Sequence, residues 1–264
     1  MRNPSTVDAA TLPAESIGRA GLAGRGYTGY NFVSERSRQV ISVATNLYRV
    51  NFGCGQTPTP GWKNFDNSPS VRLSRHPFVV RVLRVVGLLD AQQWENIQFC
   101  RNHEVLRGDC TCIPLSDASV EVLYSSHMLE HLDRDEARKF LSEARRVLSV
   151  GGILRLAVPD LALLAREYAE TGNASVLLER MHVSSARPKT FAGKLRFLLV
   201  GPRNHLWMYD AASLSQLLSA AGFENVQVMA AGSTSIAAPG GLNLRERESE
   251  SLYVEAMKSY RPAT

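Results

Sequence analysis

The segment LYRVNFGCGQTPTPGWKNFD, residues 47–66, constrains the fold more than any other part of the chain. It opens with a short apolar run that ends at Phe52, which we expect to be a buried strand, and it breaks at Gly53-Cys54-Gly55. Glycines at a strand's carboxyl end let backbone come close to a ligand, because no Cβ intervenes, and ligands bind at that edge of open α/β sheets. Asp66 ends the next predicted strand, where its carboxylate can accept hydrogen bonds from two ribose hydroxyls. The segment therefore predicts a site for a cofactor that contains a nucleoside.

The residues after Gly55 argue against a dinucleotide. The fingerprint G-x-G-x-x-G needs a third glycine, but Pro58 stands in its place, and the sequence has no P-loop lysine-serine pair. At this point the chain resembles the class I S-adenosylmethionine-dependent methyltransferases, whose first motif ends in G-x-G and whose second-strand acid holds the ribose. Two alternatives stay open: an NAD-type oxidoreductase on a similar sheet, and a non-catalytic module that keeps the cofactor site.

Two later segments carry the same resemblance. Asp109 precedes Ile113-Pro114-Leu115 and a predicted strand over Val120–Tyr124, as in the family's pattern of an Asp before "-LPF-". The run RVLSVGGILRLAVPDL resembles the family's "RVLKPGG-L-I-VPD" segment. The resemblance covers about residues 45–160 by motif and 205–258 by pattern only. It implies an α/β fold with a doubly wound, mostly parallel, seven-stranded Rossmann-like sheet and a C-terminal antiparallel hairpin.

The resemblance also implies the chemistry and the residues that hold the cofactor. The cofactor would be S-adenosylmethionine, and the reaction would move its methyl group to an oxygen or nitrogen nucleophile. Asp66 would hold the ribose, and Asp109 with the backbone of Cys110 would hold adenine, although Gly108-Asp109 also suits a simple turn. The expected cofactor-binding residues are Asn51, Gly53, Cys54, Gly55, Asp66, Asp109, Cys110 and Ser126.

Three histidines are the candidates to orient an acceptor or take its proton: His127, His131 and His205. Imidazole titrates near neutral pH, and the alternative for each is a packing or capping role. The pattern H-x-x-E-H at residues 127–131 would place two of them on one face of a helix. It can be read as a zinc-hydrolase motif, but no downstream ligand stands in a suitable context, so we expect no metal. Trp207 and Tyr209 either line an acceptor pocket or pack a lid.

We expect a loose N-terminal tail, residues 1–26, followed by one methyltransferase-like domain, residues 27–264. Helical insertions are expected within this domain at about 67–107 and 161–209. From Pro77 the spacing predicts a helix with Phe78, Val82 and Val85 on one face and arginines on another. We favour packing on the sheet or over the site. The alternative is a basic amphipathic helix that gives peripheral membrane contact through residues 71–89.

Clear helical spacing also predicts helices over residues 133–148 and 211–221. The insertion at 161–209 is expected to hold helices over 161–168 and 174–181. A strand over 224–229 and a final alternating strand over 252–256 complete the pattern.

The composition limits the partners. A net charge of +5 and a pI of about 9.2 suit an anionic substrate, but there is no basic run with interleaved aromatics, so we expect no nucleic acid. The four cysteines have no C-x-x-C spacing and the N-terminus lacks the apolar core of a signal peptide, which predicts a cytoplasmic protein with reduced thiols. The chain resembles methyltransferases found with surface-polysaccharide enzymes, which makes a sugar hydroxyl of a cell-surface glycan the leading acceptor.

Overall fold

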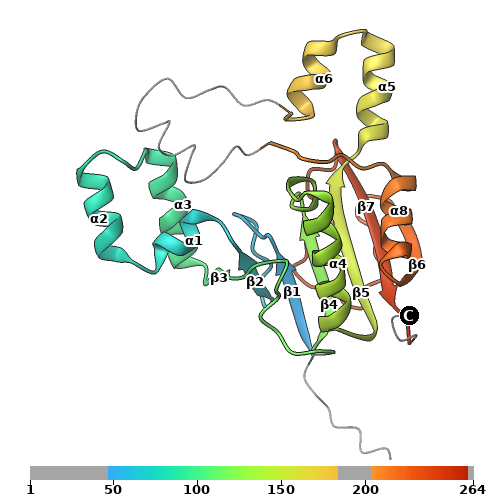
Figure 1. Ribbon diagram of the computed structural model, residues 1–264, viewed down its shortest axis with the longest axis horizontal. Helices are drawn as coiled ribbons and strands as arrows, with labels where there is room; N and C mark the ends of the chain where they lie inside the picture. The colour runs from blue at the N-terminus through green and yellow to red at the C-terminus, as the bar shows by residue number, and fades with distance from the viewer. Residues whose placement is uncertain (1–46, 184–203, 261–264) are drawn as a thin grey trace, which may run out of the picture. The chain divides into compact units, whose positions relative to one another are not determined.

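A single seven-stranded sheet organises the protein. The structure, a computed structural model, describes residues 47–183 and 204–260, all of which belong to the unit 44–264. The strand order is β3-β2-β1-β4-β5-β7-β6 (Figure 1). The strands are β1 (Tyr48–Phe52), β2 (Lys63–Asp66), β3 (Leu106–Arg107), β4 (Val120–Ser126), β5 (Leu148–Pro159), β6 (Phe223–Met229) and β7 (Ser251–Lys258).

The directions of the strands confirm the predicted sheet. β1 pairs in parallel with β2 and β4, β2 pairs in parallel with β3, and β4 pairs in parallel with β5. β7 runs antiparallel to both β5 and β6. The carboxyl ends of β1, β2, β4 and β5 therefore meet at one edge of the sheet, where ligands bind in folds of this kind.

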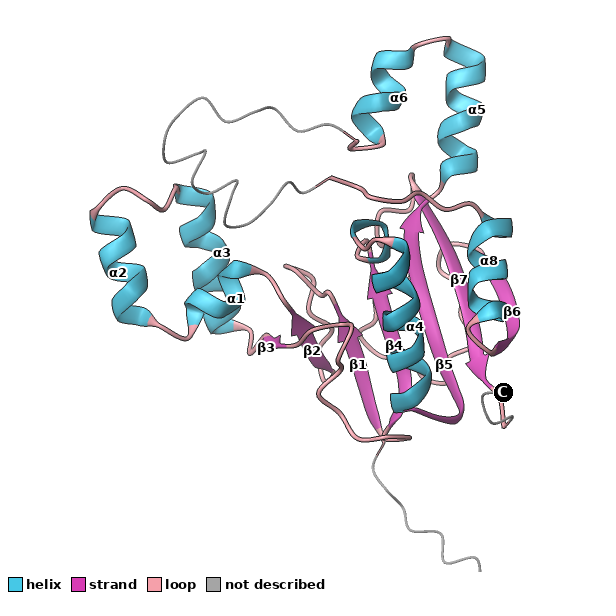
Figure 2. Ribbon diagram, viewed as in Figure 1, coloured by secondary structure: helices cyan, strands magenta, loops and turns pink. Residues whose placement is uncertain are grey.

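Two helices cover one face of the sheet, α4 (Arg134–Val147) and α8 (Ala211–Ala220) (Figure 2). Both match the predictions. Asp133 caps α4 in a reciprocal capping box with Glu136, and Asp210 caps α8. Phe140, among the buried residues of α4, packs in the main core with the inward side chains of β1, β4, β5 and β7. A smaller core on the opposite face is formed by side chains such as Tyr124 with apolar residues of the connection between β6 and β7.

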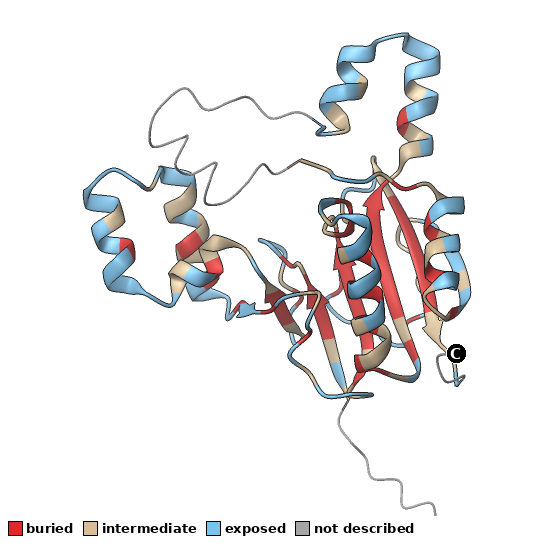
Figure 3. Ribbon diagram, viewed as in Figure 1, coloured by how far each residue is buried: buried red, intermediate tan, exposed pale blue. Residues whose placement is uncertain are grey.

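The first insertion holds three helices: α1 (Pro69–Ser74), α2 (Pro77–Val85) and α3 (Ala91–Asn102). Val71 of α1 and Cys100 of α3 are buried together with Cys54 of the glycine segment, so α1 and α3 are tied to the predicted site. The expectation that α2 buries its apolar face is wrong, because Phe78 is 78% exposed and Val85 is 80% exposed. Most of α2 is coloured as exposed in Figure 3. The helix packs through Val80 instead.

The second insertion begins directly after β5. α5 (Leu161–Thr171) and α6 (Ala174–Arg180) confirm the two predicted helices. The basic and apolar stretch at 189–200 and the predicted tail at 1–26 lie outside the described residues. None of the described helices has the length and hydropathy needed to cross a bilayer.

Candidate active site

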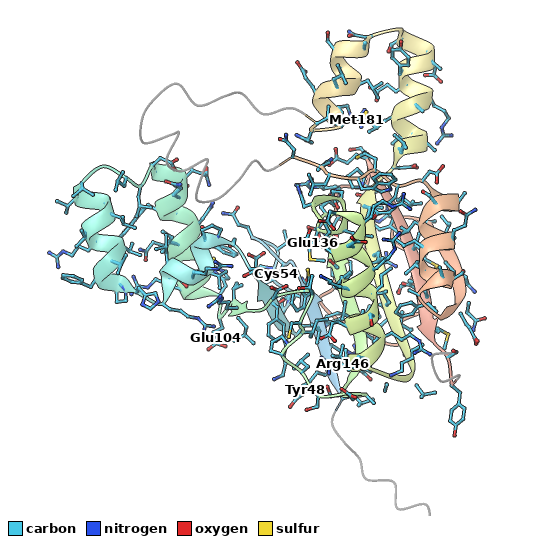
Figure 4. All side chains as sticks on the ribbon, viewed as in Figure 1. Tyr48, Cys54, Glu104, Glu136, Arg146 and Met181 are labelled. Carbon is cyan, nitrogen blue, oxygen red and sulfur yellow. The ribbon has the colours of Figure 1, made fainter. Side chains whose placement is uncertain are left out.

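The glycine segment wraps over the end of β2. The amides of Gly53 and Cys54 both donate to the carbonyl oxygen of Phe65, at 2.8 and 3.1 Å. The amide of Gly55 donates to Oδ2 of Asp66 at 3.0 Å. Figure 4 labels Cys54 at this end of β1 and Tyr48 at the other. The segment and the acidic residue that the sequence predicts to act together are therefore in direct contact.

Gly53 also fixes the distance between this loop and the turn after β4. Its φ is +75°, and a Cβ there would lie 2.8 Å from the side chain of Met128. A larger residue would have to displace Met128 and would be strained in the left-handed region. Glycine is therefore required for the loop to approach the residues that follow β4.

Asp66 is oriented by backbone amides on both of its oxygens. Oδ1 accepts from the amide of Ser68 at 2.6 Å, while Oδ2 accepts from Gly55. A carboxylate has about four acceptor sites, so each oxygen keeps a free lone pair. The geometry suits an acid that is held in place before it meets two ribose hydroxyls.

Asn51 is buried at the end of β1 and binds the loop that follows. Its side chain is 1% exposed, and Nδ2 donates to the carbonyl of Thr57 and to Oγ1 of Thr59, at 3.0 and 3.1 Å. Its side chain is thus bound within the loop, and its contact with the cofactor stays a prediction. Asn51 orders the loop together with Asn64 of β2, whose side-chain amide accepts from the backbone N–H of Thr59 and donates to its carbonyl.

Asp109 lies in a tight turn after β3. Its Oδ1 accepts from both the amide and the hydroxyl of Thr111, at 2.9 and 2.8 Å. Gly108 lets this turn sit on the core, because a Cβ there would lie 2.8 Å from the ring of Phe65. Cys110 is half-buried against the core, and burial, followed by the charge of Asp109, raises the pKa of its thiol to about 12. Contact of this turn with adenine stays a prediction.

The turn after β4 is not the helix that the sequence predicts. His127 has a φ of +49°, and only a 3-10 helix, η1 (Leu129–His131), follows it. A residue in the left-handed region cannot continue a right-handed helix, so the spacing argument for His127 and His131 is wrong. Ser126, at the end of β4, has a buried hydroxyl with no hydrogen-bond partner of normal geometry among the described residues.

His127 nevertheless points into a polar network. Its Nε2 lies 2.8 Å from Oγ of Ser251, and Ser251 donates to the carbonyl of Glu246 at 3.0 Å. The carboxylate of Glu246 accepts from the hydroxyl of Thr57 in the glycine loop at 2.9 Å. The network joins His127 to the predicted cofactor loop through residues that the sequence did not single out.

Glu130 is the central residue that the sequence analysis missed. Its side chain is fully buried, and its Oε1 lies 3.3 Å from Nδ1 of His127 and 3.9 Å from Nε2 of His205. Its carbonyl accepts from the amides of Leu206 and Trp207, at 2.7 and 3.2 Å, and so holds the segment that carries His205. The sequence signal for Glu130 was its place in the H-x-x-E-H pattern at residues 127–131.

Three of the six histidines have a ring nitrogen within 4.8 Å of the Glu130 carboxylate, and a fourth contacts the ring of His205. We call the four the histidine cluster: His127, His131, His182 and His205. The His205 ring makes edge contacts with those of His131 and His182, with centroids 4.9 and 5.0 Å apart. Burial lowers the pKa of His205 to about 4, against the opposing effect of Glu130 and with help from the neighbouring histidines. His205 is therefore a neutral imidazole at neutral pH. The fold thus brings the three predicted histidines together and adds His182.

The two aromatic residues beside His205 have separate roles. Tyr209 is buried in the main core, and burial raises its pKa to about 12, so the interpretation as a pocket residue is wrong for Tyr209. Trp207 is 41% exposed and packs beneath the guanidinium of Arg134, which lies 4.7 Å from its ring centroid.

The comparison with protein families decides the class. Residues 81–156, from within α2 to within β5, match the model of a family described as a methyltransferase domain. The match spans 76 of the 264 residues of the chain. This match confirms the predicted enzyme class, a methyltransferase that uses S-adenosylmethionine, and the sheet described above is the Rossmann-like methyltransferase fold.

Solved structures similar to this methyltransferase are distant. They include S-adenosylmethionine-dependent methyltransferases from Thermotoga maritima (18% identity, 80% of this chain and 82% of that chain, TM-score 0.42), Methanosarcina mazei (12%, 80% and 92%, 0.44) and Archaeoglobus fulgidus (14%, 81% and 87%, 0.42). At these values they decide nothing about the acceptor. No curated protein matches the chain.

Proposed function

We propose that this methyltransferase methylates an oxygen or nitrogen nucleophile, with a sugar hydroxyl of a cell-surface glycan as the leading acceptor. One observation carries the proposal: the buried Glu130 follows β4, next to the loop expected to hold the cofactor, and the histidine cluster lies around it. A hydroxyl must lose its proton as it is methylated, and imidazoles beside a carboxylate can accept one. The choice of a sugar rests on the resemblance to enzymes found with polysaccharide synthesis.

The residues at the sheet edge fit S-adenosylmethionine. Asp66 offers acceptor sites for the ribose, and Asp109 and the backbone of Cys110 would hold adenine. When bound, the cofactor supplies a methyl group that is already activated by a positive sulfur. The protein's own task is therefore to position the acceptor and to remove its proton.

His127 is the strongest candidate for the base. Its Nδ1 lies 3.3 Å from Oε1 of Glu130, whose negative charge would stabilise the imidazolium that forms when the ring takes a proton, and 3.2 Å from Nη1 of Arg247, whose positive charge acts against it. Its Nε2 is held by Ser251, which fixes the orientation of the ring. His205 is less suited to this role, because burial disfavours its protonated form.

Isotopically labelled S-adenosylmethionine, offered with sugar nucleotides, oligosaccharides and small amines, tests the proposal. We expect transfer to a sugar hydroxyl, with kcat reduced at least about 100-fold in His127→Ala, the range of general-base effects. His103→Ala, an exposed histidine at the end of α3, is the matched control. Cofactor binding without transfer to any acceptor would instead support the non-catalytic module.

The exposed face of α2 supports a second proposal, peripheral contact with an anionic membrane. Phe78 and Val85 are largely exposed on α2, whose arginines, Arg81 and Arg84, can attract anionic lipid headgroups. Vesicles with and without phosphatidylserine test this contact by co-sedimentation. Binding should require the anionic lipid and fall in Phe78→Ser, but not in Val228→Ser, which changes an exposed valine on β6. Equal binding by both variants would contradict the contact.

A further inference from the structure

We infer that Glu130, His131 and His205 form a binding site for a divalent transition-metal ion, with zinc as the best fit. One ligand atom from each of the three residues lies within 4.8 Å of the other two. The H-x-x-E-H pattern lacks a downstream ligand in sequence, and the fold supplies one by bringing His205 to Glu130.

The state of Glu130 is the first argument for a cation. The carboxylate is 0% exposed, and neither oxygen has a hydrogen-bond partner of normal geometry among the described residues. A buried carboxylate is stable only when it is paired, hydrogen-bonded or bound to a metal. The nearest basic groups to Oε1 of Glu130 are Nδ1 of His127 at 3.3 Å and Nε2 of His205 at 3.9 Å, and neither contact has the geometry of a hydrogen bond. A divalent ion on the other side would satisfy this charge.

The two imidazoles have the arrangement of metal ligands. Nδ1 of His131 lies 3.1 Å from the carbonyl of Asn204, and a ring N–H that donates to a carbonyl leaves the other nitrogen free to bind a metal. Nδ1 of His205 is buried and has no hydrogen-bond partner among the described residues, while its Nε2 faces Glu130. Both rings therefore keep a nitrogen available near the same carboxylate.

The ligand set selects the ion. Two histidines and one glutamate hold zinc in open catalytic sites, where the fourth position takes water or substrate. Adjacent ligand atoms around zinc lie about 3.4 Å apart when the bonds are about 2.1 Å, so the three groups must draw closer on binding. His131 is exposed at the surface and can move, which also gives the ion a route from solvent.

The role of the ion rests on the proposed function. An acceptor hydroxyl bound at the open position would lose its proton more readily, because a bound divalent cation lowers the pKa of a coordinated oxygen. His127 would be the residue to receive that proton. Its Nδ1 lies 3.3 Å from Oε1 of Glu130, and its Nε2 contacts Ser251. The metal site and the base would then share Glu130 between them.

Zinc and cobalt binding test the site without an activity assay. Full-length protein freed of metal with a chelator should take up one equivalent of zinc that survives desalting. Cobalt should give visible ligand-field bands without a thiolate charge-transfer band, because all four cysteines lie outside the cluster. His131→Ala and Glu130→Gln should weaken zinc binding at least about 100-fold, as expected for direct ligands when even their supporting residues account for about 10–100-fold. His103→Ala is the control, and it should bind zinc as the wild type does.

Three results would overturn the inference: no stoichiometric zinc in the wild type, equal zinc affinity in His131→Ala, or a thiolate band with cobalt. His131 is exposed, so its variant should fold even if Glu130→Gln does not. Calorimetry with S-adenosylmethionine in the presence of chelator separates this inference from the proposed function. Cofactor binding without metal binding would remove only the metal site, and metal binding without cofactor binding would remove only the proposed function.

Discussion

At the scale of single residues, Gly53 sets the approach of the cofactor loop to the turn after β4. Gly53→Ala should lower the free energy of unfolding by about 2 kcal/mol, because the new methyl meets Met128 and φ is +75°. Gly55→Ala is the matched control, since its φ is +50° but no atom lies within 4 Å of the added Cβ. Urea unfolding of both variants measures the difference. Equal losses would show that Met128 does not constrain the loop.

Cys54 makes stability depend on pH in the alkaline range. Burial, followed by the charge of Asp66, raises the pKa of its thiol from 9.0 to about 12. The folded state therefore keeps the proton above pH 9, where the unfolded state loses it, and stability falls as the pH rises from about 9 towards 12. Between pH 8 and pH 10 the loss from this thiol should be about 1 kcal/mol.

Unfolding of the wild type and of Cys54→Ala at several pH values measures this loss. The absolute stability of the variant will also change, because its side chain is smaller, so the slopes are compared rather than the values. The variant should have the shallower alkaline slope. Parallel slopes would mean that Cys54 ionises as easily in the folded protein as in the unfolded chain.

At the scale of elements, a buried ion pair joins β5 to β7 and anchors the connection between β6 and β7. Arg155 and Glu255 are cross-strand partners, both almost fully buried, and Glu255 also accepts from the amide and hydroxyl of Ser235. Burial would raise the pKa of Glu255, but the hydrogen bonds from Ser235 and Thr234 hold it below its ordinary value. The same connection carries Glu246, which reaches the cofactor loop.

Breaking this pair on one side should be strongly destabilising. Glu255→Gln leaves the Arg155 charge buried without its counter-charge, which should cost about 3–5 kcal/mol. Replacing both residues by methionine should cost less, since no charge is then left unpaired. Chemical denaturation of the single and double variants measures the two losses. A double methionine variant that loses as much as the sum of Arg155→Met and Glu255→Met would argue against a coupled pair.

Elements were also the scale at which the sequence was most informative. The apolar runs and helical spacings predicted β1, α4, α5, α8 and the final hairpin, most clearly α4, whose buried residues recur at helical spacing. The same helical spacing led to a wrong prediction of burial for α2. A sequence pattern shows that a helix has an apolar face, but it does not show whether another element covers that face. The turn at His127 was missed because a positive φ at a residue other than glycine leaves no mark in the sequence pattern.

At the scale of the whole molecule, the site depends on contacts between distant parts of the chain. Gly55 and Asp66 are close in sequence, so their meeting could be predicted from the motif. Glu130 and His205 are more than seventy residues apart in the sequence. They meet because the segment that carries His205 donates two backbone hydrogen bonds to the carbonyl of Glu130. His182 joins by a similar long-range contact. No local sequence pattern predicts such a long-range contact. The residues expected to bind the cofactor could therefore be predicted, whereas the residues around Glu130, on the acceptor side, could be predicted only in part.

The binding of S-adenosylmethionine, measured by calorimetry on the wild type, Asp66→Ala and Asp117→Ala, tests the central claim most directly. Asp117 precedes β4, at the opposite edge of the sheet, and pairs there with Arg146. We predict micromolar binding by the wild type, about −8 kcal/mol. The affinity should fall at least about tenfold, or 1.4 kcal/mol, in Asp66→Ala, where the ribose loses its acceptor, and should be unchanged in Asp117→Ala. Wild-type protein that does not bind, or an Asp66→Ala variant that binds as tightly, would contradict the placement of the cofactor at this edge.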